Sequence, residues 1–112
     1  ARRSLILPVG GAFHSSLMND AKSELKEAID NTNFSEPSCP IYQNFNANKT
    51  VLISEIKNNL INQLTNPVLW TQTVNNMIND GINDFIEVGP GKVLQGLIRK
   101  INRDCSTRSA LA

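Results

Sequence analysis

The sequence predicts an α/β fold, and three observations lead to this class. Short apolar segments with strand character alternate with longer segments whose apolar residues recur at helical spacing. Their order is strand, helix, strand, helix, helix, strand, helix, which is typical of α/β proteins. The last strand segment, at residues 85–88, passes through a Gly-Pro-Gly turn directly into a helical segment.

The first half of the chain contains two predicted strands and one predicted helix. Residues 4–9 form a short apolar strand, which Pro8 restricts to a sheet edge or a strand end, and a pair of glycines follows it. Apolar residues at helical spacing predict an amphipathic helix near residues 16–31. After a polar loop with two prolines, residues 41–45 predict a second short strand and residues 46–49 a turn.

The second half contains three helices by the same criterion, with apolar stripes at Ile53–Leu64, Trp70–Ile78 and Val93–Ile101. Asn66 and Pro67 indicate a new helix start, with Asn66 as the N-cap and Pro67 in the first turn. Gly81 is expected just beyond the end of the helix that follows. Residues from about 104 predict a frayed tail.

Composition excludes several classes of protein. The 112 residues carry 11 Lys and Arg against 10 Asp and Glu, so the net charge of +1 excludes a strongly basic nucleic-acid-binding protein. A 40% hydrophobic content with a small net charge excludes a disordered chain. No apolar run reaches the roughly 20 residues that span a bilayer. Cys39 and Cys105 have no zinc-site spacing and are expected to be reduced thiols.

Few residues suggest chemistry on their own. His14 is the only histidine, and it is either a general base or an ordinary surface or helix-capping residue. The loop at residues 89–92 lacks the spacing of a phosphate-binding loop, which favours a tight structural turn, and Glu87 before it is expected to make a local hydrogen bond. The adjacent Arg2 and Arg3 suit an acidic partner or a solvated pair.

The catalytic equipment and the sheet are both incomplete. The sequence holds no Gly-x-Ser-x-Gly elbow that would activate a serine nucleophile. Two short core strands are also too few for an independent sheet, so the predicted helices lack a complete sheet to pack against. Both points indicate a part of a larger protein.

Three segments taken together resemble a known family. They are LPVGGAFHS at residues 7–15, QLTNPVLW at 63–70 and FIEVGPGKVL at 85–94. In this order and spacing they are similar to the C-terminal part of bacterial malonyl-CoA:acyl carrier protein transacylases, over about residues 1–103. The resemblance implies the C-terminal part of an α/β-hydrolase-like parallel-sheet core together with the last strand of a ferredoxin-like subdomain.

The resemblance also implies how the chain is divided. Residues 1–9 match the last strand of the ferredoxin-like subdomain, residues 10–103 match the core, and residues 104–112 are a tail. In the family the nucleophilic serine, an oxyanion-hole glutamine and an arginine for the malonate carboxylate lie upstream of this region, and none is present here. The implied partners are therefore acyl carrier protein, malonyl-CoA or coenzyme A, and the missing N-terminal half of the same enzyme, without nucleic acid or membrane.

The resemblance assigns catalytic roles to two residues. His14 matches the catalytic histidine, which takes the serine proton, protonates the leaving coenzyme A thiolate and then deprotonates the carrier-protein thiol in a ping-pong cycle. Gln63 matches the residue whose backbone carbonyl orients that imidazole, in place of an Asp carboxylate.

It also assigns binding roles. Phe13 is expected either to exclude acyl groups bulkier than malonyl from the pocket or to pack in the core under the helix. Arg2 and Arg3 match a basic pair proposed to contact the acidic carrier protein. The residues expected to frame the floor of the site are Asn66, Pro67 and Val68.

Two alternatives remain open at this stage. One is a stand-alone module that binds carrier protein without catalysis, and the other is a piece of a polyketide synthase acyltransferase domain. The implied [acyl-carrier-protein] S-malonyltransferase activity needs no bound cofactor or metal, with malonyl-CoA as the substrate. The expected location is the cytoplasm, or the plastid stroma in a plastid-bearing source, and the isolated chain is expected to be inactive because it lacks the serine.

Overall fold

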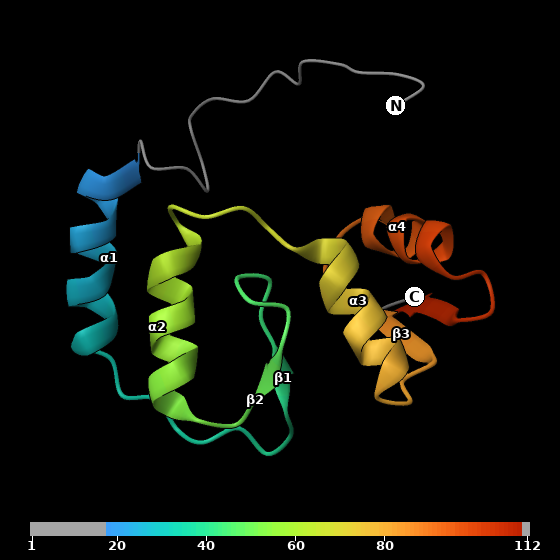
Figure 1. Cartoon of the computed structure of the whole chain (residues 1–112), viewed down its shortest axis with the longest axis horizontal. Helices are drawn as coiled ribbons and strands as arrows, with labels where there is room; N and C mark the ends of the chain where they lie inside the picture. The colour runs from blue at the N-terminus through green and yellow to red at the C-terminus, as the bar shows by residue number, and fades with distance from the viewer. Residues whose placement is uncertain (1–17, 111–112) are drawn as a thin grey trace.

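The computed structural model describes residues 18–110 and confirms the α/β class (Figure 1). The helices in this range are α1 (Asn19–Asp30), α2 (Ile53–Gln63), α3 (Trp70–Asn79) and α4 (Val93–Ile101). The strands are β1 (Ile41–Tyr42), β2 (Lys49–Thr50), β3 (Asp84–Glu87) and β4 (Ser106–Ser109). The first predicted strand lies outside the described residues, so the division of the chain at residue 9 stays a prediction.

One group of elements consists of α1, α2 and the hairpin β1–β2. The two helices pack side by side, and β1 pairs with β2 antiparallel (Figure 1). Helix α1 is amphipathic as predicted: Ile29 is buried, Lys22 is half-buried and the other charged residues are exposed. In α2 the buried residues are Ile56, Asn59 and Ile61.

The second group is a strand–helix–strand unit covered by α3. Strand β3 pairs in parallel with β4, and α4 connects them, which is the usual way to join parallel strands. The buried core of this unit is Val74, Ile98 and Cys105, with the partly buried Trp70, Ile78, Phe85 and Ile101 packed against it. Helices α3 and α4 therefore cover the face of the sheet that carries Phe85.

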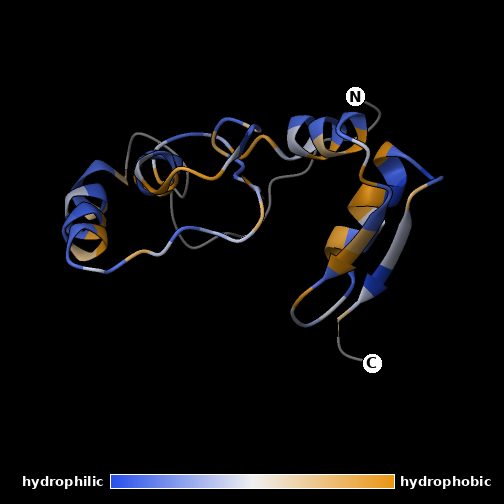
Figure 2. Cartoon of the chain, turned by 90° about the horizontal axis from the view of Figure 1, so that it is seen from below, coloured by the Kyte–Doolittle hydropathy of each residue, from blue (hydrophilic) through white to orange (hydrophobic). Residues whose placement is uncertain are grey.

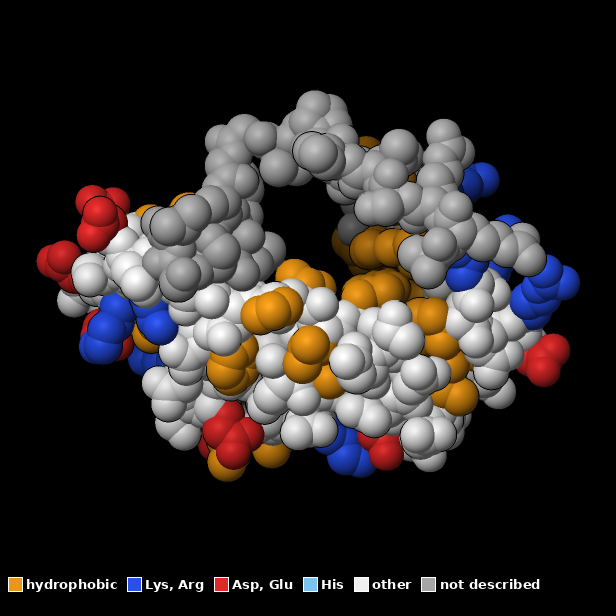
Figure 3. Space-filling view, turned by 45° about the horizontal axis from the view of Figure 1, so that its top comes forward, with side chains coloured by type: hydrophobic (Ala, Val, Ile, Leu, Met, Phe, Trp, Pro, Cys, Tyr) orange, Lys and Arg blue, Asp and Glu red, His pale blue; other side chains and the backbone are white. Residues whose placement is uncertain are grey.

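Much apolar surface stays outside this small core. Figure 2 shows hydrophobic residues along the C-terminal elements, and Figure 3 shows hydrophobic side chains gathered near the middle of one face, with charged groups toward its ends. Among the described residues the exposed large hydrophobic side chains are Ile41, Val51, Leu52, Leu60, Val68, Ile86, Val88, Val93, Leu94 and Leu97. Exposed apolar side chains that gather on one face are typical of a contact surface in soluble proteins.

The structure corrects two predictions about the strands. The frayed tail expected from residue 104 is wrong over part of its length, because Ser106–Ser109 forms β4 and pairs with β3. The strand expected at residues 41–45 is limited to Ile41–Tyr42, and its partner Lys49–Thr50 falls where the end of a turn was expected. Strands β1 and β2 have only two residues each, and β4 is polar. None of these three strands therefore has a local apolar pattern that would predict its pairing.

The end of α3 follows the prediction. Gly81 has a φ of 99°, and its N–H donates to the Ile78 carbonyl at 3.0 Å. The N–H of Ile82 donates to the Met77 carbonyl, also at 3.0 Å, so the two bonds form a Schellman motif. A glycine tolerates this left-handed conformation without a Cβ clash, and the motif directs the chain from α3 into β3.

Candidate functional site

The residues expected in the site divide into two sets. Arg2, Arg3, Phe13 and His14 lie outside the described residues 18–110. Gln63, Asn66, Pro67 and Val68 lie together, where α2 ends and the link to α3 begins.

Gln63 is the last residue of α2, which places its carbonyl at the C-terminal end of a helix. Carbonyls in the last turn lack intrahelical partners, and the helix dipole gives this end a partial negative charge. The Gln63 carbonyl accepts the Asn66 N–H at 3.2 Å. A carbonyl oxygen has two lone pairs and can therefore accept two donors, an N–H of an imidazole among them.

The turn after α2 is closed by side chains. The Gln63 Nε2 donates to the backbone carbonyls of Asn66 at 2.9 Å and Pro67 at 3.0 Å. The Asn66 Nδ2 donates backward to the Asn62 carbonyl at 2.7 Å. The structure thus brings Gln63, Asn66 and Pro67 into one hydrogen-bonded turn, while Val68 is 42% exposed in the link that follows.

The role expected for Asn66 as a helix N-cap is wrong. Helix α3 begins at Trp70, after Leu69, and no side chain caps its first turn. Asn66 instead satisfies a carbonyl at the end of the preceding helix. An Asn-Pro pair between two helices can serve the end of the first or the start of the second, and here Asn66 serves the end of α2.

The link is also anchored to the hairpin group. The Leu69 N–H donates to the Asn44 carbonyl at 2.8 Å, and the Gln43 Nε2 donates to the Ile56 carbonyl at 3.0 Å. The Asn59 Nδ2, from a residue only 7% exposed, donates to the Gln43 Oε1 at 2.9 Å. A depression of about 250 Å³ lies beside this segment, lined by Tyr42, Gln43, Asn44, Asn59, Leu60 and Gln63.

The sequence suggested no role for Asn44, Asn59, Asn76 or Gln43. The chain contains fifteen asparagines, and this abundance was their only signal. In the structure Asn59, Asn66 and Asn76 each use the side-chain amide to hold a neighbouring segment.

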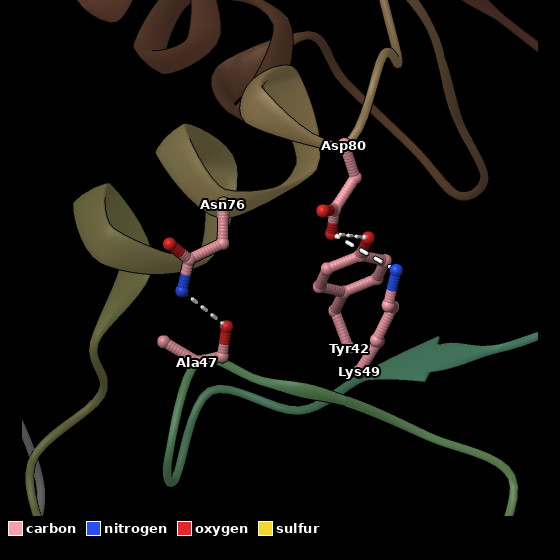
Figure 4. A network of polar contacts seen from close by, with 5 residues as sticks. All are labelled: Tyr42, Ala47, Lys49, Asn76 and Asp80. Carbon is pink, nitrogen blue, oxygen red and sulfur yellow. Dashed lines mark hydrogen bonds and ion pairs between the residues drawn. The ribbon is translucent and has the colours of Figure 1, made fainter.

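A second polar network joins the hairpin to the end of α3 (Figure 4). Asp80 accepts a hydrogen bond from the Tyr42 hydroxyl and lies 3.6 Å from the Lys49 Nζ. The Asn76 Nδ2 donates to the carbonyl of Ala47 at 2.8 Å, and Ala47 is buried with a positive φ of 62°. The network therefore fixes the hairpin that holds Leu69.

The Asp80 carboxylate raises the pKa of Tyr42 from 10.0 to about 12, first by accepting the hydroxyl hydrogen bond, with burial and charge repulsion from Asp80 adding to it. Replacing Asp80 by asparagine is expected to return this pKa toward 10. Tyr42 is the only tyrosine, so the ultraviolet absorbance of tyrosinate against pH reports this group alone. An unchanged midpoint in Asp80→Asn would contradict the contact.

The raised pKa of Tyr42 also determines how the stability of the fold changes with pH. Because the folded pKa lies above the unfolded value near 10, the Tyr42 contact stabilises the fold fully below pH 10 and is lost as pH rises toward 12. The melting temperature of the parent should therefore fall toward that of Asp80→Asn across this window, and not at lower pH.

The Gly-Pro-Gly turn is structural, as expected. Gly89 and Gly91 have φ values of 126° and 82°. The Glu87 carboxylate accepts the backbone N–H groups of Leu94 and Gln95 in the first turn of α4, each at 3.3 Å. Because a carboxylate already occupies these donors, the helix start does not favour a phosphate.

Residues 18–110 contain neither a metal-binding cluster nor a membrane-spanning helix. In that range no group of three or more His, Cys, Asp or Glu residues is arranged to hold a metal ion. None of the helices there is long and apolar enough to cross a membrane. Cys39 and Cys105 are both free thiols.

Comparison with known proteins shows which enzymes this chain is similar to. No family model matches the sequence. The chain is 41% identical over 107 residues to "Malonyl CoA-acyl carrier protein transacylase" of Bacillus subtilis. The aligned residues make up 96% of this chain. Over nearly all of its length the chain is similar to malonyl-CoA:acyl carrier protein transacylases.

Solved structures of transacylases agree. The acyl-carrier-protein S-malonyltransferase of Bartonella henselae matches with a TM-score of 0.93 and 33% identity over 99% of this chain, and that of Vibrio cholerae with 0.91 and 36% identity over 97%. The chain spans about a third of these relatives: 34% of the Bacillus transacylase, 35% of the Bartonella structure and 36% of the Vibrio structure. These transacylase matches do not favour the binding-module or polyketide-synthase alternatives.

Proposed function

We propose that this chain supplies the general-base part of a malonyl-CoA:acyl carrier protein transacylase. The observation that carries the proposal is the 41% identity to the Bacillus subtilis transacylase over nearly the whole chain. The position of Gln63 supports it, because a carbonyl at the end of α2 is suited to accept an imidazole N–H.

The proposed cycle has two half-reactions. His14 takes the proton of a serine hydroxyl supplied by the part of the fold that this chain does not span, and the serine oxygen attacks the thioester carbonyl of malonyl-CoA. The carbon–sulfur bond breaks, and His14 gives its proton to the leaving thiolate. His14 then deprotonates the carrier-protein thiol, whose sulfur attacks the malonyl-serine ester, and the serine regains its proton.

Gln63 is proposed to orient His14 in this cycle. Its backbone carbonyl fixes which imidazole nitrogen carries the hydrogen, and the negative end of the α2 dipole favours the imidazolium that forms. A helix end contributes about 0.3–1 kcal/mol in such a contact, which is less than a buried carboxylate provides.

The remaining residues are proposed to select and position substrates. Phe13 limits the acyl pocket to malonyl, and a basic pair steers the acidic carrier protein toward the site. The floor of the site is formed by Asn66, Pro67 and Val68. The basic pair is Arg2 and Arg3. The reaction needs no cofactor because acyl transfer between a thiol and a hydroxyl involves no redox step, and we place it in the cytoplasm.

A chimera tests this proposal. In it, residues 1–112 replace the aligned third of the Bacillus subtilis transacylase, and malonyl transfer from malonyl-CoA to acyl carrier protein is measured. We expect the chimera to transfer malonyl and the isolated 112-residue chain to show only the uncatalysed rate. A folded chimera without activity, beside an active Bacillus parent, would contradict the proposal, as would turnover by the isolated chain.

A further inference from the structure

The Gln63 carbonyl lies at the start of a stretch that a third segment holds at both ends. Helix α2 ends at Gln63 and α3 begins at Trp70, so residues 64–69 connect the two helices. The segment that holds them consists of Gln43 and Asn44, directly after β1. Because a catalytic group must be kept close to its productive geometry, the contacts that hold this stretch bear on the direction of the carbonyl.

The side chain of Gln43 is bound to α2 through both ends of its amide. Its Nε2 donates to the Ile56 carbonyl at 3.0 Å, and its Oε1 accepts the Asn59 Nδ2 at 2.9 Å. Ile56 and Asn59 are both buried. A buried amide pair favours one arrangement of the segments that it joins, since a shift leaves a polar group without a partner. Gln43 therefore ties the start of the hairpin loop to one position along α2.

The next residue holds the other end of the stretch. The Leu69 N–H donates to the Asn44 carbonyl at 2.8 Å, and Leu69 is the last residue before α3. Gln43 and Asn44 are neighbours in the chain, so a rigid peptide unit connects the attachment on α2 to the attachment at Leu69. Gln63 and the turn after it lie between these two points.

The hairpin is also fixed to α3, which lets it act as a brace between the two helices (Figure 4). The Asn76 Nδ2 donates to the Ala47 carbonyl at 2.8 Å, and Asp80 at the end of α3 accepts the Tyr42 hydroxyl. The hairpin thus contacts α2 through Gln43 and α3 through Ala47 and Tyr42. A shift of either helix would break bonds on one side of the brace.

We propose that Gln43 is a positioning residue for malonyl transfer. By holding α2 and the stretch to Leu69 together, it sets the direction in which the Gln63 carbonyl meets the His14 imidazole. The inference rests on the proposed function, because Gln43 acts only through the contact between that carbonyl and the imidazole. A displacement of about 1 Å at a catalytic contact can cost about a hundredfold in rate, so the loss of this brace is measurable in kcat.

A purely structural role for Gln43 predicts different kinetics. A structural bond stabilises the fold but leaves the contact with the imidazole unchanged, so its loss lowers the melting temperature and not the rate of each folded molecule. A positioning bond lowers kcat and leaves KM for malonyl-CoA unchanged, and it does so only while His14 is present. The two roles are therefore separated in a background from which His14 has been removed.

The experiment uses the chimera with the Bacillus subtilis transacylase. Gln43→Met keeps the length of the side chain and removes both amide bonds, so we expect kcat about tenfold below that of the parent chimera, with KM for malonyl-CoA unchanged. In the His14→Ala chimera the same substitution should change the residual rate by less than about twofold. Gln43→Met combined with Asn59→Leu leaves no unpaired buried side-chain amide, so it keeps the test readable if Gln43→Met does not fold, and its kcat should fall equally.

Gln95→Met is the matched control, because it makes the same change at a buried glutamine on α4. The Gln95 Nε2 donates to the Glu87 Oε1 at 3.3 Å and to the Ser109 Oγ at 2.9 Å, so this variant also loses two amide bonds. These bonds do not hold the Gln63 turn, and kcat should stay within about twofold of the parent. An equal loss of kcat in Gln95→Met and Gln43→Met would overturn the proposal.

Hydrogen exchange of the same chimeras measures the Gln63 turn independently of activity. Peptides that cover residues 63–69 should exchange about tenfold faster in Gln43→Met than in the parent, because the Asn66 and Leu69 N–H groups lose their fixed acceptors. A parent-like kcat in Gln43→Met, an equal loss with and without His14, or unchanged exchange would each overturn the proposal. An inactive parent chimera contradicts the proposed function instead, and the exchange of residues 63–69 then decides whether Gln43 holds the turn.

Discussion

Replacing His14 by alanine in the chimera is expected to slow malonyl transfer by about two to four orders of magnitude, the usual contribution of a positioned general base. The loss arises because no other histidine in the 112 residues can take its place. The steady-state rate with malonyl-CoA and acyl carrier protein measures it.

Two comparisons separate catalysis from folding in this variant. Added imidazole should restore part of the rate of His14→Ala, and the melting temperature should match that of the parent chimera. Gln63→Ala keeps the backbone carbonyl and removes the Nε2 bonds to Asn66 and Pro67, so the rate of this variant should fall about tenfold or less. A His14→Ala chimera within a few-fold of the parent rate would contradict the assigned role.

The second large effect is on stability. Ile98→Ala should lower the free energy of unfolding of the chain by about 2–5 kcal/mol, because Ile98 is 5% exposed and packs in the core with Val74 and Cys105. Such a loss is a large part of the stability of a chain of this size. The midpoint of urea unfolding, followed by circular dichroism, measures it.

Leu97→Ala is the matched control on the same helix. Leu97 is 37% exposed, so its loss should remain below about 1 kcal/mol. Ile98→Val provides a graded variant with an expected loss of about 0.5–1.5 kcal/mol, which keeps the test readable if Ile98→Ala does not fold. Equal losses of unfolding free energy in Leu97→Ala and Ile98→Ala would show that the core around Val74 is not formed.

Helices were predictable because their signal is local. The apolar spacing around Val74 and Ile98 identifies α3 and α4, and Gly81 marks the end of α3. Strand β4 was missed because Ser-Thr-Arg-Ser has no apolar alternation and its pairing depends on β3, about 20 residues earlier. Leu60 shows that apolar spacing does not always identify the buried face of a helix. The spacing placed Leu60 in the apolar stripe, but in the structure it is 42% exposed.

The candidate site was predictable only in part, for a related reason. The roles of His14 and Gln63 came from the resemblance to the family, since a lone histidine carries little information. The contacts that hold the Gln63 turn involve residues far apart, such as Asn44 with Leu69, and no local pattern contains them. The position of Gln63 at a helix end follows from where α2 stops, whereas the predicted apolar stripe continues to Leu64.

We propose that this chain provides the base and not the nucleophile of malonyl transfer. The most direct test is to incubate the chimera with malonyl-CoA in the absence of carrier protein and to locate the covalent malonyl group by peptide mass spectrometry. We expect a malonyl ester on a serine of the Bacillus-derived part and none within residues 1–112. A malonyl ester on any serine of the 112 residues would contradict it.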